Sequence, residues 1–149
     1  MEETTQQSLT NSDVLEKVLT NVIDIFSRKS VRIHSVLILQ DIVKKLQKQY
    51  PFLQDVTISD TKDQHTLLDK RMVAIGPGIN AVPVDKVGMS LHAILDGFAQ
   101  IIGKNDTYFL LTELQSALPG RYISQIGSMG VDFELILLER EIDYLESGN

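Results

Sequence analysis

The chain has no cysteine and only three histidines among its 149 residues. Without cysteine it can form no disulfide, use no thiol nucleophile and hold no metal through thiolates. His34, His65 and His92 are too far apart for the i, i+4 spacing with which one helix presents two imidazoles to zinc. We therefore expect no metal and no cofactor, while a weak metal or acid–base site that folding assembles from His65 with Asp60 or Asp63 stays open.

Long apolar runs are also lacking, and we expect no leader segment. No run approaches the ~20 residues that cross a bilayer. Residues 1–11 are polar and acidic, whereas a signal peptide is basic and then apolar. The formal net charge of −6 argues against general binding of polyanions. We therefore expect a soluble, cytoplasmic protein that makes no membrane contact.

Nucleotide and hydrolase motifs are absent as well. Glycines after a strand, as in Gly76-Pro77-Gly78, can open the backbone to an anion. Here the proline removes one N–H, no helix is expected before about Asp85, and the Lys and hydroxyl of a phosphate-binding loop are missing. No Gly-x-Ser-x-Gly elbow occurs either. We interpret this stretch first as a hairpin turn in which Gly76 or Gly78 has a positive φ, and second as a weak ligand site formed by Gly76, Gly78 and Asn80.

The charges are distributed unevenly. Segment 28–48 contains six basic residues and one acid, Asp41, whereas segment 132–146 contains six acids and one base. Neither interleaved aromatics nor a disordered basic tail accompanies the basic stretch, so a solvated helix face is favoured over nucleic-acid binding. The two segments could face each other, within one chain or between two. The basic residues are Arg28, Lys29, Arg32, Lys44, Lys45 and Lys48.

Helical periodicity is strongest over residues 84–118. Apolar residues recur three or four positions apart on both sides of a polar break at 103–106, which predicts two central helices. Asp85 can cap the first helix and Gly103 can end it. The second should start with Asn105 or Asp106 as its cap and stop before Pro119.

Two features of these central helices are candidate contact sites. Ser90, Ala93 and Gly97 form a stripe of small side chains, which indicates either a packing groove within the chain or a site for a close partner. Tyr108 and Phe109 point away from the leucines of their helix, so they are also candidates for a partner contact.

The N-terminal third predicts a disordered lead over residues 1–11 and a helix pair over 12–50. Ser12 can cap the first helix, and Pro51 ends the second. Neither glycine nor proline occurs between them, so the break at 27–30 depends on a polar interruption alone. A single long helix is the alternative.

Residues 52–83 predict a small antiparallel sheet. The stretch 55–59 alternates with the two-residue period of a strand, 72–75 is a second apolar strand, and 79–82 can extend or pair with it. Residues 60–66 are expected to be a turn or loop, and Pro83 ends the ladder. The chain is therefore predicted to be one helix-dominated α+β domain over 12–149, with a helical bundle over 84–146.

The last helix is predicted to begin at Asp132 and to carry two apolar sides. A single neighbouring layer cannot cover both, so one side should meet a partner. The aliphatic side comprises Val131, Leu135, Leu138, Ile142 and Leu145. The aromatic side, which we favour as the partner surface, comprises Phe133, Leu137 and Tyr144, with Arg140 between them.

These observations favour a non-enzymatic regulatory, signalling or adaptor domain that acts through protein–protein contact as a homodimer. A second hypothesis is a sensory domain that binds a small ligand between the sheet and the central helices. A third is an enzyme whose polar site has no recognisable motif.

Overall fold

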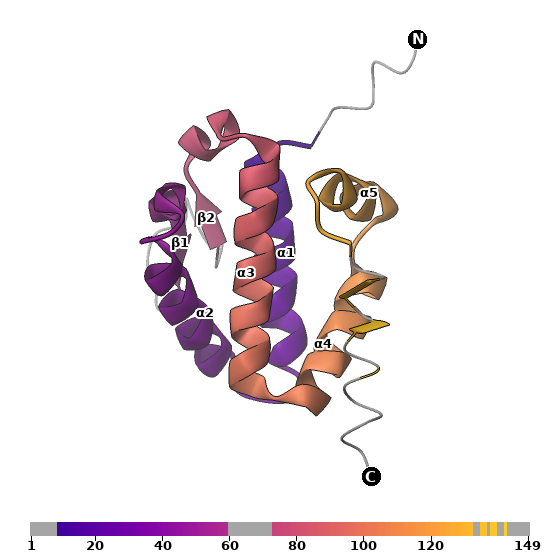
Figure 1. Cartoon of the computed structure of the whole chain (residues 1–149). Helices are drawn as coiled ribbons and strands as arrows, with labels where there is room; N and C mark the ends of the chain where they lie inside the picture. Colours follow the sequence, from indigo (N-terminus) through magenta and orange to yellow (C-terminus); the bar gives the residue numbers. More distant parts are fainter. Residues whose placement is uncertain (1–8, 60–72, 133–134, 137, 140–141, 143–149) are drawn as a thin grey trace.

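The computed structural model describes residues 9–59, 73–132, 135, 136, 138, 139 and 142. The described part is helix-dominated with one small antiparallel sheet, which confirms the predicted α+β class (Figure 1). The helices are α1 (Asn11–Phe26), α2 (Arg32–Leu46), α3 (Val84–Ile102), α4 (Lys104–Ala117) and α5 (Gly120–Ser128). The strands are β1 (Val56–Ile58) and β2 (Val73–Ile75), and two 3-10 helices are η2 (Pro51–Asp55) and η4 (Pro77–Ala81).

Helices α1 and α3 form the centre of the core. In Figure 1, α3 lies in front of α1, with α2 and the sheet on one side and α4 and α5 on the other. Phe26 of α1 and Phe98 of α3 meet edge to face, with ring centroids 5.4 Å apart. Such pairs stabilise a core by about 1 kcal/mol beyond the burial of their area. The N-terminal helix α1 is therefore as central as the helices over 84–118.

The N-terminal region forms two helices, as predicted, rather than one long helix. The break follows Phe26, where the Ser27 hydroxyl donates to the Ile23 carbonyl at 2.6 Å. The starts of the central helices differ from the prediction: α3 follows Pro83 rather than a cap at Asp85, and α4 follows Gly103 rather than a cap at Asn105 or Asp106. Two boundaries of the N-terminal pair differ as well. The cap of α1 is Thr10, not Ser12, because the Thr10 side chain and Asp13 form a reciprocal capping box. Helix α2 ends at Leu46, four residues before the predicted end at Tyr50.

The sheet pairs β1 with β2 in antiparallel register, with Thr57 opposite Ala74. Residues 79–82 are not a strand: η4 occupies Pro77–Ala81. The positive φ predicted at Gly76 or Gly78 is also wrong, since Gly76 has φ −67° and the positive-φ glycines of the described chain are Gly103 and Gly130. A 3-10 turn beginning at proline makes the corner without any left-handed residue.

Two of the C-terminal turns do require glycine. Gly103, with φ 92°, ends α3 as predicted, and Gly130, with φ 97°, follows α5. After Gly130 the chain turns back so that Met129 and Val131 are both buried. This turn packs against α3 at Gly88, where a β-carbon would lie 2.0 Å from the Met129 carbonyl oxygen.

Candidate functional site

The C-terminal segment begins as the sequence predicts. The Asp132 carboxylate accepts a hydrogen bond from the Leu135 N–H at 3.1 Å, and the Asp132 carbonyl accepts one from the Ile136 N–H at 3.0 Å. The described residues 135, 136, 138, 139 and 142 are helical. The predicted partner residues Phe133, Leu137, Arg140 and Tyr144 lie outside the described residues.

The aliphatic side of this segment is exposed. Leu135, Leu138 and Ile142 are 52%, 53% and 48% exposed, and their spacing of three and four residues places them on one helix face. Ile136, on another face, packs against the core. The segment is therefore held to the fold by one side and presents an apolar stripe on the other. The aromatic side, which the sequence favoured as the partner surface, lies outside the described residues, so that choice stays a prediction.

The other exposed large hydrophobic side chains have a restricted distribution. Ile33 and Leu37 lie on α2, with Val31 at its N-cap, and Met89 lies on α3. Val84 and Ile101 lie at the two ends of α3. Within the described chain, none comes from α1, α4 or α5. We call Ile33, Leu37, Met89, Leu135, Leu138 and Ile142 the apolar face.

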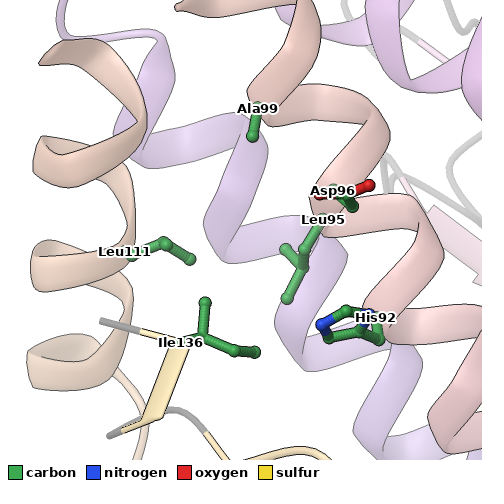
Figure 2. Close-up of a pocket in the computed structure, with 6 residues that line it drawn as sticks. All are labelled: His92, Leu95, Asp96, Ala99, Leu111 and Ile136. Atoms are coloured by element: carbon green, nitrogen blue, oxygen red, sulfur yellow. The ribbon is translucent and has the colours of Figure 1, made fainter. Parts of the chain in front are cut away.

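A small cavity lies where the C-terminal segment meets α3 and α4. Figure 2 shows Ile136 pointing between Leu111 of α4 and Leu95 of α3, with His92 at the side. The cavity measures about 10 Å³, the space of a single water molecule. It is a packing defect under the last helix and too small for a metabolite.

The stripe of small residues is used for packing within the chain. Ser90 is fully buried, and its hydroxyl donates to the Val87 carbonyl at 2.7 Å. A β-carbon at Gly97 would lie 3.3 Å from a methyl group of Ile42 on α2, and Ala93 is half-buried against the core. The tightest backbone contact at a described glycine, that of Gly88 with Met129, was not among the predicted sites. The two residues are 41 positions apart along the chain, and local spacing carries no signal of their contact.

The aromatic pair of α4 is partly covered. Phe109 packs against the core, and the Lys29 ammonium lies 4.6 Å from its ring centroid. Tyr108 is half-buried. Neither side chain belongs to the apolar face.

The glycine-rich turn and Asn80 hold the N-terminus of α1. The Asn80 side-chain carbonyl accepts the Ser12 N–H at 2.9 Å. In return, the Asn11 side-chain amide donates to the carbonyls of Ile79 at 3.0 Å and Val82 at 2.9 Å. The Asp55 carboxylate lies over Gly78, where a β-carbon would come within 2.9 Å of its oxygen. The Asn80 side chain of the predicted ligand loop thus makes a structural contact. The Asp55 carboxylate, because it lies over Gly78, would repel a bound anion.

The basic stretch meets acids of its own chain. Arg28 pairs with Glu113 of α4 at 2.8 Å, and Lys29 pairs with Asp106 of α4 at 3.1 Å. On α2, Lys45 pairs with Asp41 at 3.0 Å. These partners come from α4 and α2 rather than from the acidic segment 132–146. The remaining basic residues of the stretch are Arg32, Lys44 and Lys48.

The sheet lines a second hollow, of about 340 Å³, that opens between β1 and the C-terminal half of α2. This volume falls in the range of small-molecule and peptide sites. The sensory hypothesis placed a ligand between the sheet and the central helices, whereas this hollow lies on the α2 side. Its lining residues are Gln40, Val43, Lys44, Gln47, Val56, Thr57 and Ile58.

The titratable groups show no assembled centre in the described chain. The Ser30 hydroxyl lies 2.8 Å from Nδ1 of His34, His92 borders the small cavity, and His65 with Asp60 and Asp63 lies outside the described residues. No group of three metal-ligating side chains forms within residues 9–59 and 73–132. None of the described helices is long and apolar enough to span a membrane.

Comparison with protein-family models gave no match, and comparisons with curated proteins and with solved structures gave no significant match either. The functional proposal therefore depends on the chain's own surface.

Proposed function

We propose that this chain is a non-enzymatic regulatory or adaptor domain that associates as a homodimer through the apolar face. The observation that carries the proposal is the stripe of Leu135, Leu138 and Ile142, three aliphatic side chains each about half exposed on one helix. Contiguous exposed apolar surface of this kind is typical of partner sites in soluble proteins.

The arrangement of the elements suits a two-fold contact. Helix α2 and the C-terminal segment flank α3 on opposite sides (Figure 1). A two-fold axis parallel to α3 places α2 of one copy over the C-terminal segment of the other, and repeats that contact reciprocally. Met89 of α3 lies near the axis in such a dimer. Such a contact buries the exposed apolar side chains of α2, of α3 and of the C-terminal segment together.

Charge supports the same pairing. The segment 132–146 has six acids and one base, and of the acids Asp132 and Glu139 are described and exposed. Helix α2 carries the opposite charge, with three basic residues and one acid between Arg32 and Leu46. Two acidic C-terminal segments in contact would repel each other, whereas the C-terminal segment of one copy and α2 of the other attract. The charges thus favour α2 over a second C-terminal segment as the contact.

The expected affinity is modest. Burying the exposed half of a leucine or isoleucine contributes about 1 kcal/mol. Leu135, Leu138 and Ile142 of both copies together contribute ~6 kcal/mol. A micromolar Kd corresponds to a net binding free energy of about 8 kcal/mol, and association also costs translational and rotational freedom. With Ile33, Leu37 and Met89 of both copies added, the sum is about 12 kcal/mol, and an association cost of about 4 kcal/mol leaves the ~8 kcal/mol of a micromolar Kd.

The test is the mass in solution of three proteins, measured by light scattering. The wild type should be a dimer at high micromolar concentration, and Leu138→Asp should be a monomer. Ser124→Asp is the matched control, because it adds the same charge at an exposed position of α5, where no exposed large hydrophobic side chain lies. It should remain a dimer.

Circular dichroism of each variant shows that the helices are intact. A dimer that survives Leu138→Asp places the interface elsewhere and contradicts the proposal. Equal loss of the dimer in both variants would show an effect of charge alone.

A further inference from the structure

Strand β1 is an edge strand whose outer side faces the hollow beside α2. In the antiparallel ladder the Gly76 N–H donates to the Asp55 carbonyl at 2.9 Å, so Asp55 belongs to a hydrogen-bonded pair. Such pairs alternate along an antiparallel ladder. Thr57 therefore faces β2 with its backbone groups, while Val56 and Ile58 direct theirs outward, away from β2.

Two of these four outward groups are occupied. The Val56 N–H donates to the Leu53 carbonyl, and the Ile58 carbonyl accepts from the Gln40 side-chain amide. The amide of Gln40 thus takes the place that the N–H of a neighbouring strand would fill. The Val56 carbonyl and the Ile58 N–H have no hydrogen-bond partner among the residues that the structure describes. Val56 and Ile58 are nevertheless buried residues, and a polar backbone group in such surroundings gains from a partner.

The hollow has the shape and lining that an extended chain requires. Its floor is apolar, formed by the side chains of Val43, Val56 and Ile58, all buried. Its rim is polar, formed by Gln40, Lys44 and Gln47 of α2. The volume of about 340 Å³ suits a few residues of extended peptide. An added strand uses backbone hydrogen bonds for affinity and side-chain pockets for specificity.

We propose that β1 is a docking edge for an extended, acidic peptide segment of a partner protein, which adds as a third strand in the hollow between β1 and α2. The backbone of the peptide donates to the Val56 carbonyl and accepts from the Ile58 N–H. Displacement of the Gln40 amide from the Ile58 carbonyl allows one more ladder bond. Alternate apolar side chains of the peptide lie on the floor.

Lys44 selects acidic segments. It lines the hollow, whereas Lys45, the next residue, pairs with Asp41 outside it. A carboxylate on the outer side of the added strand lies within reach of the Lys44 ammonium, and complementary charges at an interface favour the matching partner. The two neighbouring lysines therefore provide a matched pair for testing this role.

The site is separate from the proposed dimer contact. Ile33 and Leu37 occupy the first half of α2, and the hollow lies along its second half. The monomeric Leu138→Asp variant should accordingly bind the peptide as well as the wild type does, so failure of either proposal can be recognised separately.

The probe is a synthetic seven-residue peptide of alternating valine and glutamate with blocked ends, titrated into the isotope-labelled full chain and followed by NMR. The Ile58 amide resonance should shift on binding, and its hydrogen exchange should slow at least tenfold at saturation. The same peptide with all backbone nitrogens methylated should not bind, because it cannot donate to the Val56 carbonyl. Lys44→Gln should weaken binding about threefold, and Lys45→Gln should leave it unchanged.

An Ile58 amide that neither shifts nor gains protection at millimolar peptide overturns the proposal. So does equal binding of the methylated peptide, which would show contact through side chains alone. Equal weakening in both lysine variants would remove the role of Lys44 in selection.

Discussion

At the scale of single residues, Gly88 sets the distance between α3 and the turn that follows α5. A β-carbon there would lie 2.0 Å from the Met129 carbonyl oxygen, a backbone atom that cannot rotate away. Gly127 of α5 is the opposite case, since a β-carbon there meets no atom within 4 Å. The two glycines are both helical and differ only in their surroundings.

We predict opposite effects of alanine at these two positions. Gly88→Ala should lower the free energy of unfolding by about 1–3 kcal/mol, because the added methyl group forces two backbones apart. Gly127→Ala should raise it by about 0.5–1 kcal/mol, since alanine is the better helix former. Urea unfolding of both variants measures the difference. A stable Gly88→Ala protein would mean that α3 and the turn are farther apart than described.

At the scale of elements, the start of α1 and η4 hold each other through two asparagines. Asn80 accepts the Ser12 N–H, and Asn11 donates to two carbonyls of the η4 region while only 5% exposed. Asn80 and the Thr10 side chain accept the Ser12 and Asp13 N–H groups, two of those that a helix start leaves unpaired. The corner after β2 is therefore fixed to the central helix of the core.

Substitutions of Asn80 separate this structural role from ligand binding. Asn80→Ala should destabilise the fold by about 1 kcal/mol, because the Ser12 N–H loses its acceptor. Asn80→Asp should be close to neutral, since a carboxylate still accepts that bond and its charge is favourable at a helix N-terminus. Thermal unfolding distinguishes the two. Equal destabilisation by both substitutions would show that the hydrogen bond from the Ser12 N–H does not account for the contribution of Asn80 to the stability of the fold.

The sequence predicts elements well where the signal is local. The 3.6-residue period locates α1 and α3, Gly103 marks the end of α3, and Asp132 caps the last helix. Boundaries without glycine or proline are less certain, which is why α2 ends at Leu46 instead of Tyr50. Thr10 and Ser12 are both good caps, and only the reciprocal bond with Asp13 decides between them.

Contacts between distant residues are not predictable in this way. Asn11 and Ile79 are 68 positions apart, and the approach of Gly88 to Met129 depends on how α5 turns back. The candidate surface shows the same limit. Spacing predicts two apolar sides on the last helix, but only packing shows that Leu135, Leu138 and Ile142 are exposed while Ile136 meets the core.

At the scale of the whole molecule, the exposed hydrophobic side chains and the charges have a common arrangement. The apolar face includes side chains of α2, α3 and the C-terminal segment, and the two elements that flank α3 differ in charge. Several basic residues already pair with α4 and α2, so in the proposed homodimer apolar burial should supply most of the association free energy and charge should set the orientation.

Sedimentation equilibrium of the wild-type chain tests the homodimer most directly. A single chain has a mass of 16.7 kDa. Between about 1 and 100 µM, a dimer with a micromolar Kd passes from mostly monomer to mostly dimer. We predict that the average mass rises over this range towards twice that of one chain and reaches a plateau there. A mass that stays at 16.7 kDa at every concentration would contradict the homodimer.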